Sequence, residues 1–199
     1  MKGLLAAVSA TILLSGCASM MGMQSEWKVD RAQDQFYDTS SCTVRFDDAF
    51  KQLSYYSGGV RYYPFFTKAG DGRTYFGVGS NYNVPAGDVL IRVDNNEPIR
   101  VSASETPISK SSYTPTTVKT GDEATDERVN AAMKQAMAAA SPVTMATPEK
   151  SEEILRQARA GSELKLRIIG YGVNNSNASR DGTYPLNEKM RAGLAECGI

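Results

Sequence analysis

The chain has 199 residues, in which 22 Lys and Arg balance 22 Asp and Glu, and it contains no histidine. The balanced charge, with no basic stripe, argues against a nucleic-acid partner, because such a partner leaves a concentrated positive footprint. The absence of histidine excludes Ser-His-Asp and Cys-His catalysis and removes the commonest neutral ligand for transition metals, so we expect no metal site and no cofactor.

The first sixteen residues follow the pattern of an export signal. Lys2 supplies a positive start, residues 4–14 form an apolar run, and Ser15 and Gly16 are small residues suited to cleavage. The run is too short to cross a bilayer as a helix, which takes about 20 apolar residues. We therefore predict that residues 1–16 are a cleaved signal peptide.

The end of this signal carries a specific resemblance. Leu14-Ser15-Gly16-Cys17 resembles the lipobox of bacterial lipoproteins. The resemblance implies a diacylglyceryl thioether on Cys17 and a further acyl chain, such as palmitate, on its new amine. Two or three acyl chains anchor a protein stably, because each buried methylene contributes about 0.8 kcal/mol. The alternative is an ordinary secretory signal in which Cys17 occurs by chance.

The residues after Cys17 indicate the destination. In many such lipoproteins an Asp next to the lipidated cysteine implies retention in the inner membrane, and here Ala18 and Ser19 follow. This favours the outer membrane, with the domain facing the periplasm. Residues 17–26 show no apolar periodicity, and we expect a flexible tether with a reach of about 15 to 20 Å. A single β-rich domain over 27–199 is expected to follow.

Alternating apolar residues predict several short strands. Residues 42–47 alternate Cys42, Val44 and Phe46 with polar residues. The same period of two occurs at 88–102, which forms a predicted hairpin turning at Asn95-Asn96, and at 163–168. Aromatic runs flank residues 57–59, with Pro64 favouring an edge strand, and another strand follows Asp71-Gly72. The pattern predicts a mainly β, or α+β, fold with an antiparallel sandwich or barrel-like core and two to three peripheral helices.

Helical periodicity is confined to the second half of the chain. Apolar residues at three- and four-residue steps predict an amphipathic helix over about 122–140. A second helix should run from Thr147 as N-cap to Gly161, and a third should carry apolar residues of the C-terminal segment. Residues 102–120 contain ten Ser or Thr and two Pro, which is typical of an exposed loop. We interpret about 102–148 as an insertion into the β core.

Two cysteines of the mature chain are expected to face inward. Cys42 lies on the apolar side of its strand, and Cys197 shares a helical face with Leu186, Met190 and Leu194. An exported chain matures in an oxidising compartment, which favours a Cys42–Cys197 disulfide. Two separate buried thiols are the alternative.

Three segments together resemble a known family. Residues 89–99 (VLIRVDNNEPI), 154–169 (ILRQARAGSELKLRII) and 185–197 (PLNEKMRAGLAEC) look like successive landmarks of the invasion-associated locus B family of exported bacterial proteins. The shared plan is a strand with an RVD-like core, a short helix ending at Gly, a returning strand and a final helix. The resemblance implies a β-rich envelope domain connected with host interaction and without established catalysis.

Aromatic residues provide the candidate binding surface. They crowd two segments in which neighbouring residues face opposite ways, so half of them must face away from any single core. Exposed tyrosines offer apolar contact with a polar handle, suited to protein or glycan partners. The candidate ligand-binding residues are Tyr55, Tyr56, Tyr62, Tyr63 and Phe66. The alternative for this group is aromatic packing beneath the inserted helix.

Paired carboxylates allow a second hypothesis. Glycoside cleavage needs two Asp or Glu that flank one bond, and Asp47-Asp48 and Asp94 with Glu97 are available. The leading hypothesis is a lipid-anchored, non-catalytic envelope domain that binds a protein or glycan. The alternative hypothesis is a cell-wall glycan hydrolase that uses Asp and Glu.

Overall fold

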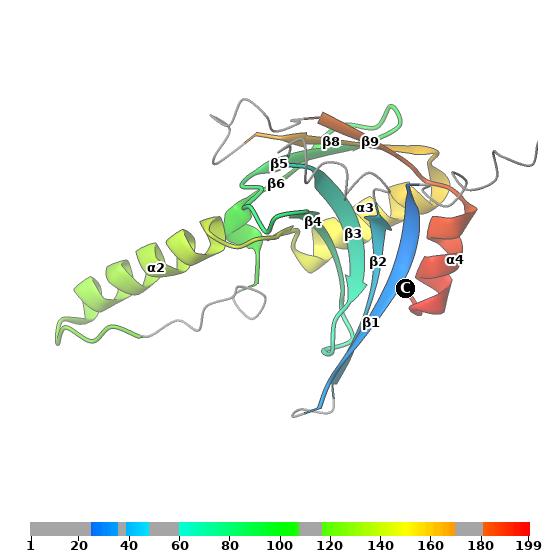
Figure 1. Cartoon of the computed structure of the whole chain (residues 1–199). Coiled ribbons are helices and arrows are strands. Elements are labelled where there is room, and N and C mark those ends of the chain that lie inside the picture. The colour runs from blue at the N-terminus through cyan, green and yellow to red at the C-terminus, as the bar shows by residue number, and fades with distance from the viewer. Residues whose placement is uncertain (1–24, 36–38, 48–59, 108–116, 170–180) are drawn as a thin grey trace, which may run out of the picture.

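The strands of the computed structural model form two antiparallel sheets (Figure 1). The structure describes residues 25–35, 39–47, 60–107, 117–169 and 181–199. Sheet A contains, in spatial order, β1 (Glu26–Asp34), β2 (Thr39–Asp47), β3 (Tyr62–Lys68), β4 (Thr74–Ser80) and β7 (Thr144–Met145). Sheet B contains β6 (Ile99–Val101), β5 (Val89–Val93), β8 (Glu163–Ile168) and β9 (Asp181–Pro185). The prediction of a β-rich, sandwich-like fold with peripheral helices is confirmed.

Both sheets contribute to one apolar core. Sheet B crosses over one end of sheet A (Figure 1), and the inward residues of both sheets belong to the same buried cluster. Trp27 links them directly, because its ring meets Phe46 edge-on at 5.6 Å while its Nε1 donates to the Pro185 carbonyl of β9 at 2.6 Å. Val44 and Leu164, each fully buried, face this core as their alternation predicts.

Helix α3 (Pro148–Ala160) covers part of the core as predicted. The Thr147 side chain accepts from the Lys150 N–H at its start, and Ile154 is fully buried on its inner face. The Ser151 hydroxyl accepts from the buried Phe76 N–H at 2.9 Å, which joins the helix to β4. Gly161 ends the helix in an extended conformation, and a Cβ there would lie 2.4 Å from the Val93 side chain. Lack of space therefore requires this glycine.

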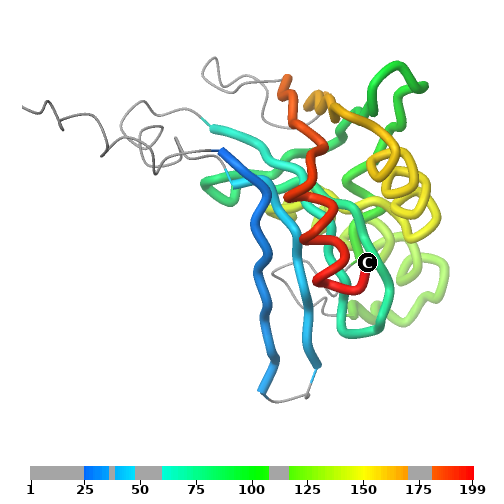
Figure 2. The backbone as a smooth tube through the Cα atoms, turned by 90° about the vertical axis from the view of Figure 1, so that its right-hand side faces the viewer, coloured from blue at the N-terminus to red at the C-terminus, as the bar shows by residue number. Residues whose placement is uncertain are grey.

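Helix α4 (Glu188–Glu196) brings the chain end back to the first strands. Figure 2 shows α4 beside β1 and β2. Met190 and Leu194 are buried on its inner face. The Cys42 and Cys197 sulfurs are bonded at 1.98 Å, with their Cα atoms 5.4 Å apart. The predicted disulfide is thus present and joins β2 to the C-terminal end of α4.

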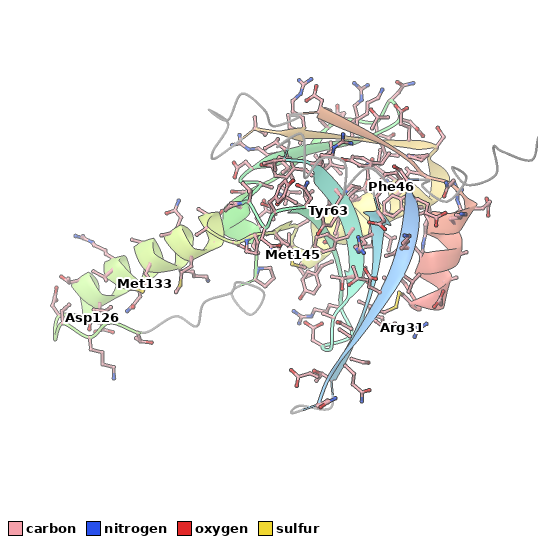
Figure 3. All side chains as sticks on the ribbon, in the orientation of Figure 1. Arg31, Phe46, Tyr63, Asp126, Met133 and Met145 are labelled. Carbon is pink, nitrogen blue, oxygen red and sulfur yellow. A yellow bond between two sulfur atoms is a disulfide. The ribbon has the colours of Figure 1, made fainter. Side chains whose placement is uncertain are left out.

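Helix α2 (Glu123–Ala139) forms where expected but lacks the expected buried face. It projects from the body (Figure 1), and Ala138 is its one buried residue. Figure 3 shows Asp126 and Met133 on the projecting part. The alanine-rich sequence and the Asp122 N-cap favour a helix without tertiary burial, and Asn130 exchanges hydrogen bonds with the Val118 backbone. In the described ranges, no helix is long and apolar enough to cross a membrane.

Pro64 lies in an interior strand, so the prediction of an edge position was wrong. β3 lies between β2 and β4, and Pro64 is paired with Val78 of β4. The β2 ladder ends at the Arg45–Phe65 pair. Pro64 therefore lies just past the end of that ladder, where its missing N–H removes no hydrogen bond to β2.

The start of the Ser/Thr-rich stretch differs from the predicted exposed loop, whereas Thr117, Lys119 and Thr120 at its end are exposed as predicted. Ser102 caps the 3-10 helix η2 (Ala103–Glu105). Thr106 is only 4% exposed, and its hydroxyl accepts from the Met145 N–H. Residues 108–116 lie outside the described residues. The Thr106 hydroxyl thus fixes β7 against η2, while Ser104 remains exposed.

The disulfide gives a first prediction. We expect the double variant Cys42→Ser/Cys197→Ser to lose up to about 5 kcal/mol of unfolding free energy, because the bond closes a long loop in the unfolded chain. Denaturant titration of the variant and of the reduced parent protein should give the same loss. Free thiols at both positions in non-reducing mass spectrometry would contradict the pairing.

Candidate functional site

The predicted aromatic residues divide between the two faces of sheet A. Phe66 is fully buried, and its ring packs at 5.2 Å from Phe76 and 6.3 Å from Trp27. Phe66 is therefore a core residue, and its assignment to a binding surface was wrong. Tyr55 and Tyr56 lie outside the described residues.

Tyr62 and Tyr63 begin β3 and point to opposite faces. Tyr62 packs against the shared core, where burial raises the pKa of its hydroxyl, and its carbonyl accepts from the Tyr184 hydroxyl. Tyr63 is half-buried on the outer face of sheet A. Of these two residues, Tyr63 is the one available to a partner on the outer face.

Glycines in β4 make room for the outer aromatic rings. Phe65 and Tyr63 pair across the strands with Gly77 and Gly79, and a Cβ on Gly77 would lie 2.2 Å from the Phe65 ring. The rings therefore lie over bare backbone. Phe65 and Tyr75 are buried here with Met145, and Figure 3 shows Tyr63 and Met145 on this part of sheet A. We call Tyr63, Phe65, Tyr75, Met145 and Val143 the outer aromatic cluster.

An ion-pair network adjoins the outer aromatic cluster. Arg45 is the cross-strand neighbour of Phe65. It forms ion pairs with Asp30 and, at 3.0 Å, with Asp47. Asp47 also forms an ion pair with Lys28 at 2.7 Å. Burial opposes ionisation of Asp47, but Lys28 and Arg45 outweigh it and lower its pKa. Burial raises the pKa of the Tyr63 hydroxyl. On the outer face of sheet A, the partly exposed Tyr63 thus lies beside Arg45 and Asp47, whose charges are paired within the fold.

The structure gives little support to carboxylate catalysis. Asp47 is held in two ion pairs, and Asp48 lies outside the described residues. Asp94 accepts from the Ser162 hydroxyl at 2.9 Å and from the backbone N–H groups of Ser162 and Glu163. These hydrogen bonds lower the pKa of Asp94, which suits a structural cap and disfavours a general acid.

A general acid for glycan cleavage needs a raised pKa. Within the ranges that the structure describes, every carboxylate with a resolved shift has a lowered pKa. Those residues also contain no group of three or more potential metal ligands. The carboxylates with a lowered pKa are therefore held in the charged form by ion pairs and hydrogen bonds, which suits a general acid poorly.

Sequence reasoning missed a groove on the outer face of sheet B. The groove has a volume of about 260 Å³, and its lining includes Leu90, Arg92, Pro98, Lys165, Arg167 and Thr183. The outward basic residues were visible in the sequence, with Arg92 in 88–94 and Lys165 and Arg167 in 163–168. The pairing of these two segments, which places the basic residues side by side, was not visible.

Comparison of the chain with protein-family models, curated proteins and solved structures found no match.

The Asp94 hydrogen bonds predict a pH dependence. Because the folded pKa of Asp94 is lowered, its carboxylate stabilises the fold fully above the unfolded value of about 3.9, and the contribution is lost as pH falls through the folded pKa. We expect Asp94→Asn to be less stable than the parent protein at neutral pH, with a difference that shrinks on acidification. Thermal unfolding across this pH range measures the effect. Glu97→Gln, in the same turn, is the matched control, and an equal loss in both variants would contradict the assignment.

Proposed function

We propose that this protein is a lipid-anchored envelope protein whose β-rich domain binds a protein or glycan partner without catalysing a reaction. The observation that carries the proposal is the Leu14-Ser15-Gly16-Cys17 sequence only nine residues before Glu26, where β1 begins. A linker of this length keeps an anchored domain within about 15 to 20 Å of the bilayer. The destination is the outer membrane, with the domain facing the periplasm.

The start of the described chain suits an anchored domain. Glu26 is ion-paired with Lys189 of α4, and Trp27 donates to Pro185 of β9. The residues that would follow the tether, Glu26 and Trp27, are thus bound to α4 and to sheet B. The disulfide, which an exported protein forms readily, reinforces the same side of the domain.

The outer face of sheet A is the proposed contact surface for the partner. Tyr63 is half-buried there and offers an apolar ring with a hydroxyl group, while the ion pairs beside it already satisfy their charges. The resemblance to invasion-associated locus B proteins extends the proposal to host interaction. Hydrolysis of cell-wall glycans is the weaker alternative, because the pKa shifts in the described carboxylates run opposite to those of a general acid.

Lipid anchoring predicts the behaviour of two variants in the native host. We expect Cys17→Ser to lose the acyl chains, migrate differently on a denaturing gel and leave the membrane fraction. We expect Ala18→Asp to remain lipidated but move from the outer to the inner membrane. Membrane sedimentation and density-gradient fractionation measure both. An unchanged mobility and membrane fraction for Cys17→Ser would reject the proposal.

The role of Tyr63 predicts a separation between binding and folding. We expect Tyr63→Ser to keep a melting temperature close to that of the parent protein while losing retention on envelope fractions, because its ring is only half-buried. Phe65→Ser is the matched control, and its buried neighbouring ring should cost about 3 kcal/mol or more in stability. If Tyr63→Ser retains the partner fully, the outer face of sheet A is not the contact surface.

A further inference from the structure

The groove on sheet B lies over three neighbouring strands. Its sides come from β5, β8 and β9, and Pro98 closes it beside the β5–β6 turn. With about 260 Å³, the groove is smaller than the 300 to 1,000 Å³ typical of sites for drug-sized ligands. It therefore suits one ring-sized group.

Strand pairing places like charges opposite one another in this groove. Arg92 and Lys165 are direct cross-strand partners, and Arg167 is the partner of Leu90 on the same face. Like charges directly opposite on neighbouring strands destabilise a sheet. A bound anion removes this cost, because it attracts both side chains.

The three cations differ in how far the protein already satisfies them. Lys165 is paired with Glu163 at 3.0 Å, and Arg167 with Asp181 at 2.7 Å. Arg92 donates to the Asn95 carbonyl at 3.3 Å and has no ion pair with any described residue. Since a guanidinium carries five N–H donors in a fork that matches a carboxylate, Arg92 is the main anchor for an anion.

The bottom of the groove favours a ligand recognised through side chains. β5 and β8 are each paired on both sides, so their backbone groups are already used in the sheet. A peptide laid across them would therefore find few backbone partners in the sheet. Leu90 and Pro98 instead offer apolar contacts, with the Thr183 hydroxyl and the Asp181 carboxylate at the side.

We propose that this groove binds one acidic sugar residue of an envelope glycan. The sugar carboxylate contacts Arg92 and Lys165, its apolar ring face lies over Leu90 and Pro98, and its hydroxyl groups contact Thr183 and Asp181. The class of ligand rests on the proposed function as an envelope binding protein, whereas the anion preference rests on the groove alone. This site is distinct from the outer aromatic cluster of sheet A.

The test uses the full chain carrying Cys17→Ser, so that acyl chains do not contribute to binding. Isothermal titration with an oligomer of galacturonic acid is compared with titration of a neutral galactose oligomer of equal length. We expect the acidic oligomer to bind roughly tenfold more tightly than the neutral one, and Arg92→Gln to weaken its binding roughly tenfold. Arg92→Lys should lose part of this affinity, because it keeps the charge and loses the fork.

Two controls separate binding from folding. Arg128→Gln, on the exposed surface of α2, should leave the affinity unchanged. Arg92→Gln should keep or slightly raise the melting temperature, because it removes the cross-strand repulsion with Lys165. A lowered melting temperature with unchanged affinity would show that Arg92 is structural and would overturn the proposal.

Three other outcomes would also overturn the inference. The first is that the neutral oligomer binds as tightly as the acidic one. The second is that Arg92→Gln and Arg128→Gln lose affinity equally. The third is that acetate or inorganic phosphate competes for the groove as strongly as unlabelled acidic oligomer does. If the acidic oligomer does not bind while Cys17 still determines membrane location, the groove assignment is rejected and the anchoring proposal is retained. If Cys17→Ser stays in the membrane while the oligomer binds, the anchoring falls and the anion site stands.

Discussion

The core shared by the two sheets is the constraint on which the rest of the structure depends. Side chains alternate along each strand, so a register shift of one residue would turn Val44 and Phe46 to solvent and bury Arg45. The same alternation fixes the outer faces. Arg45 and Tyr63 lie outside on sheet A, and Arg92 and Lys165 outside on sheet B, because their neighbours are committed to the core. The two candidate binding faces are thus consequences of core burial.

The chain ends are held by chemically different contacts at the same side of this core. The indole N–H of Trp27 reaches the Pro185 carbonyl, and the disulfide joins β2 to the last turn of α4. The hydrogen bond stabilises the folded state directly, whereas a disulfide acts mainly on the entropy of the unfolded chain. The hydrogen bond thus holds β1, the edge strand of sheet A, against sheet B, and the disulfide holds its neighbour β2 against α4.

Local patterns in the sequence predicted most elements but not how they pair. The period of two located β5, β6 and β8, and the Thr147 cap and Gly161 located α3, because these signals depend on neighbours in sequence. The interior position of Pro64 and the short strand β7 depend on ladder length and on partners far along the chain. The exposure of α2 was missed for a related reason, since alanine spacing predicts a helix whether or not anything packs against it. Of the candidate site, alternation predicted that half of the aromatic residues face away from the core but not which half: Tyr63 lies on the outer face, whereas Phe66 is fully buried.

The outward arginines of the two sheets have different surroundings. We therefore assign a structural role to Arg45 and propose a binding role for Arg92. On sheet A, Arg45 lies between Asp30 and Asp47, so its charge is balanced within the fold. On sheet B, Arg92 faces Lys165, and within the described part of the chain its guanidinium donates to the Asn95 carbonyl. Both side chains occupy outward positions on interior strands. The Arg92–Lys165 pair places two positive charges directly opposite each other, an arrangement that destabilises a sheet. This pairing beside the groove of sheet B is the observation on which the proposed anion site rests.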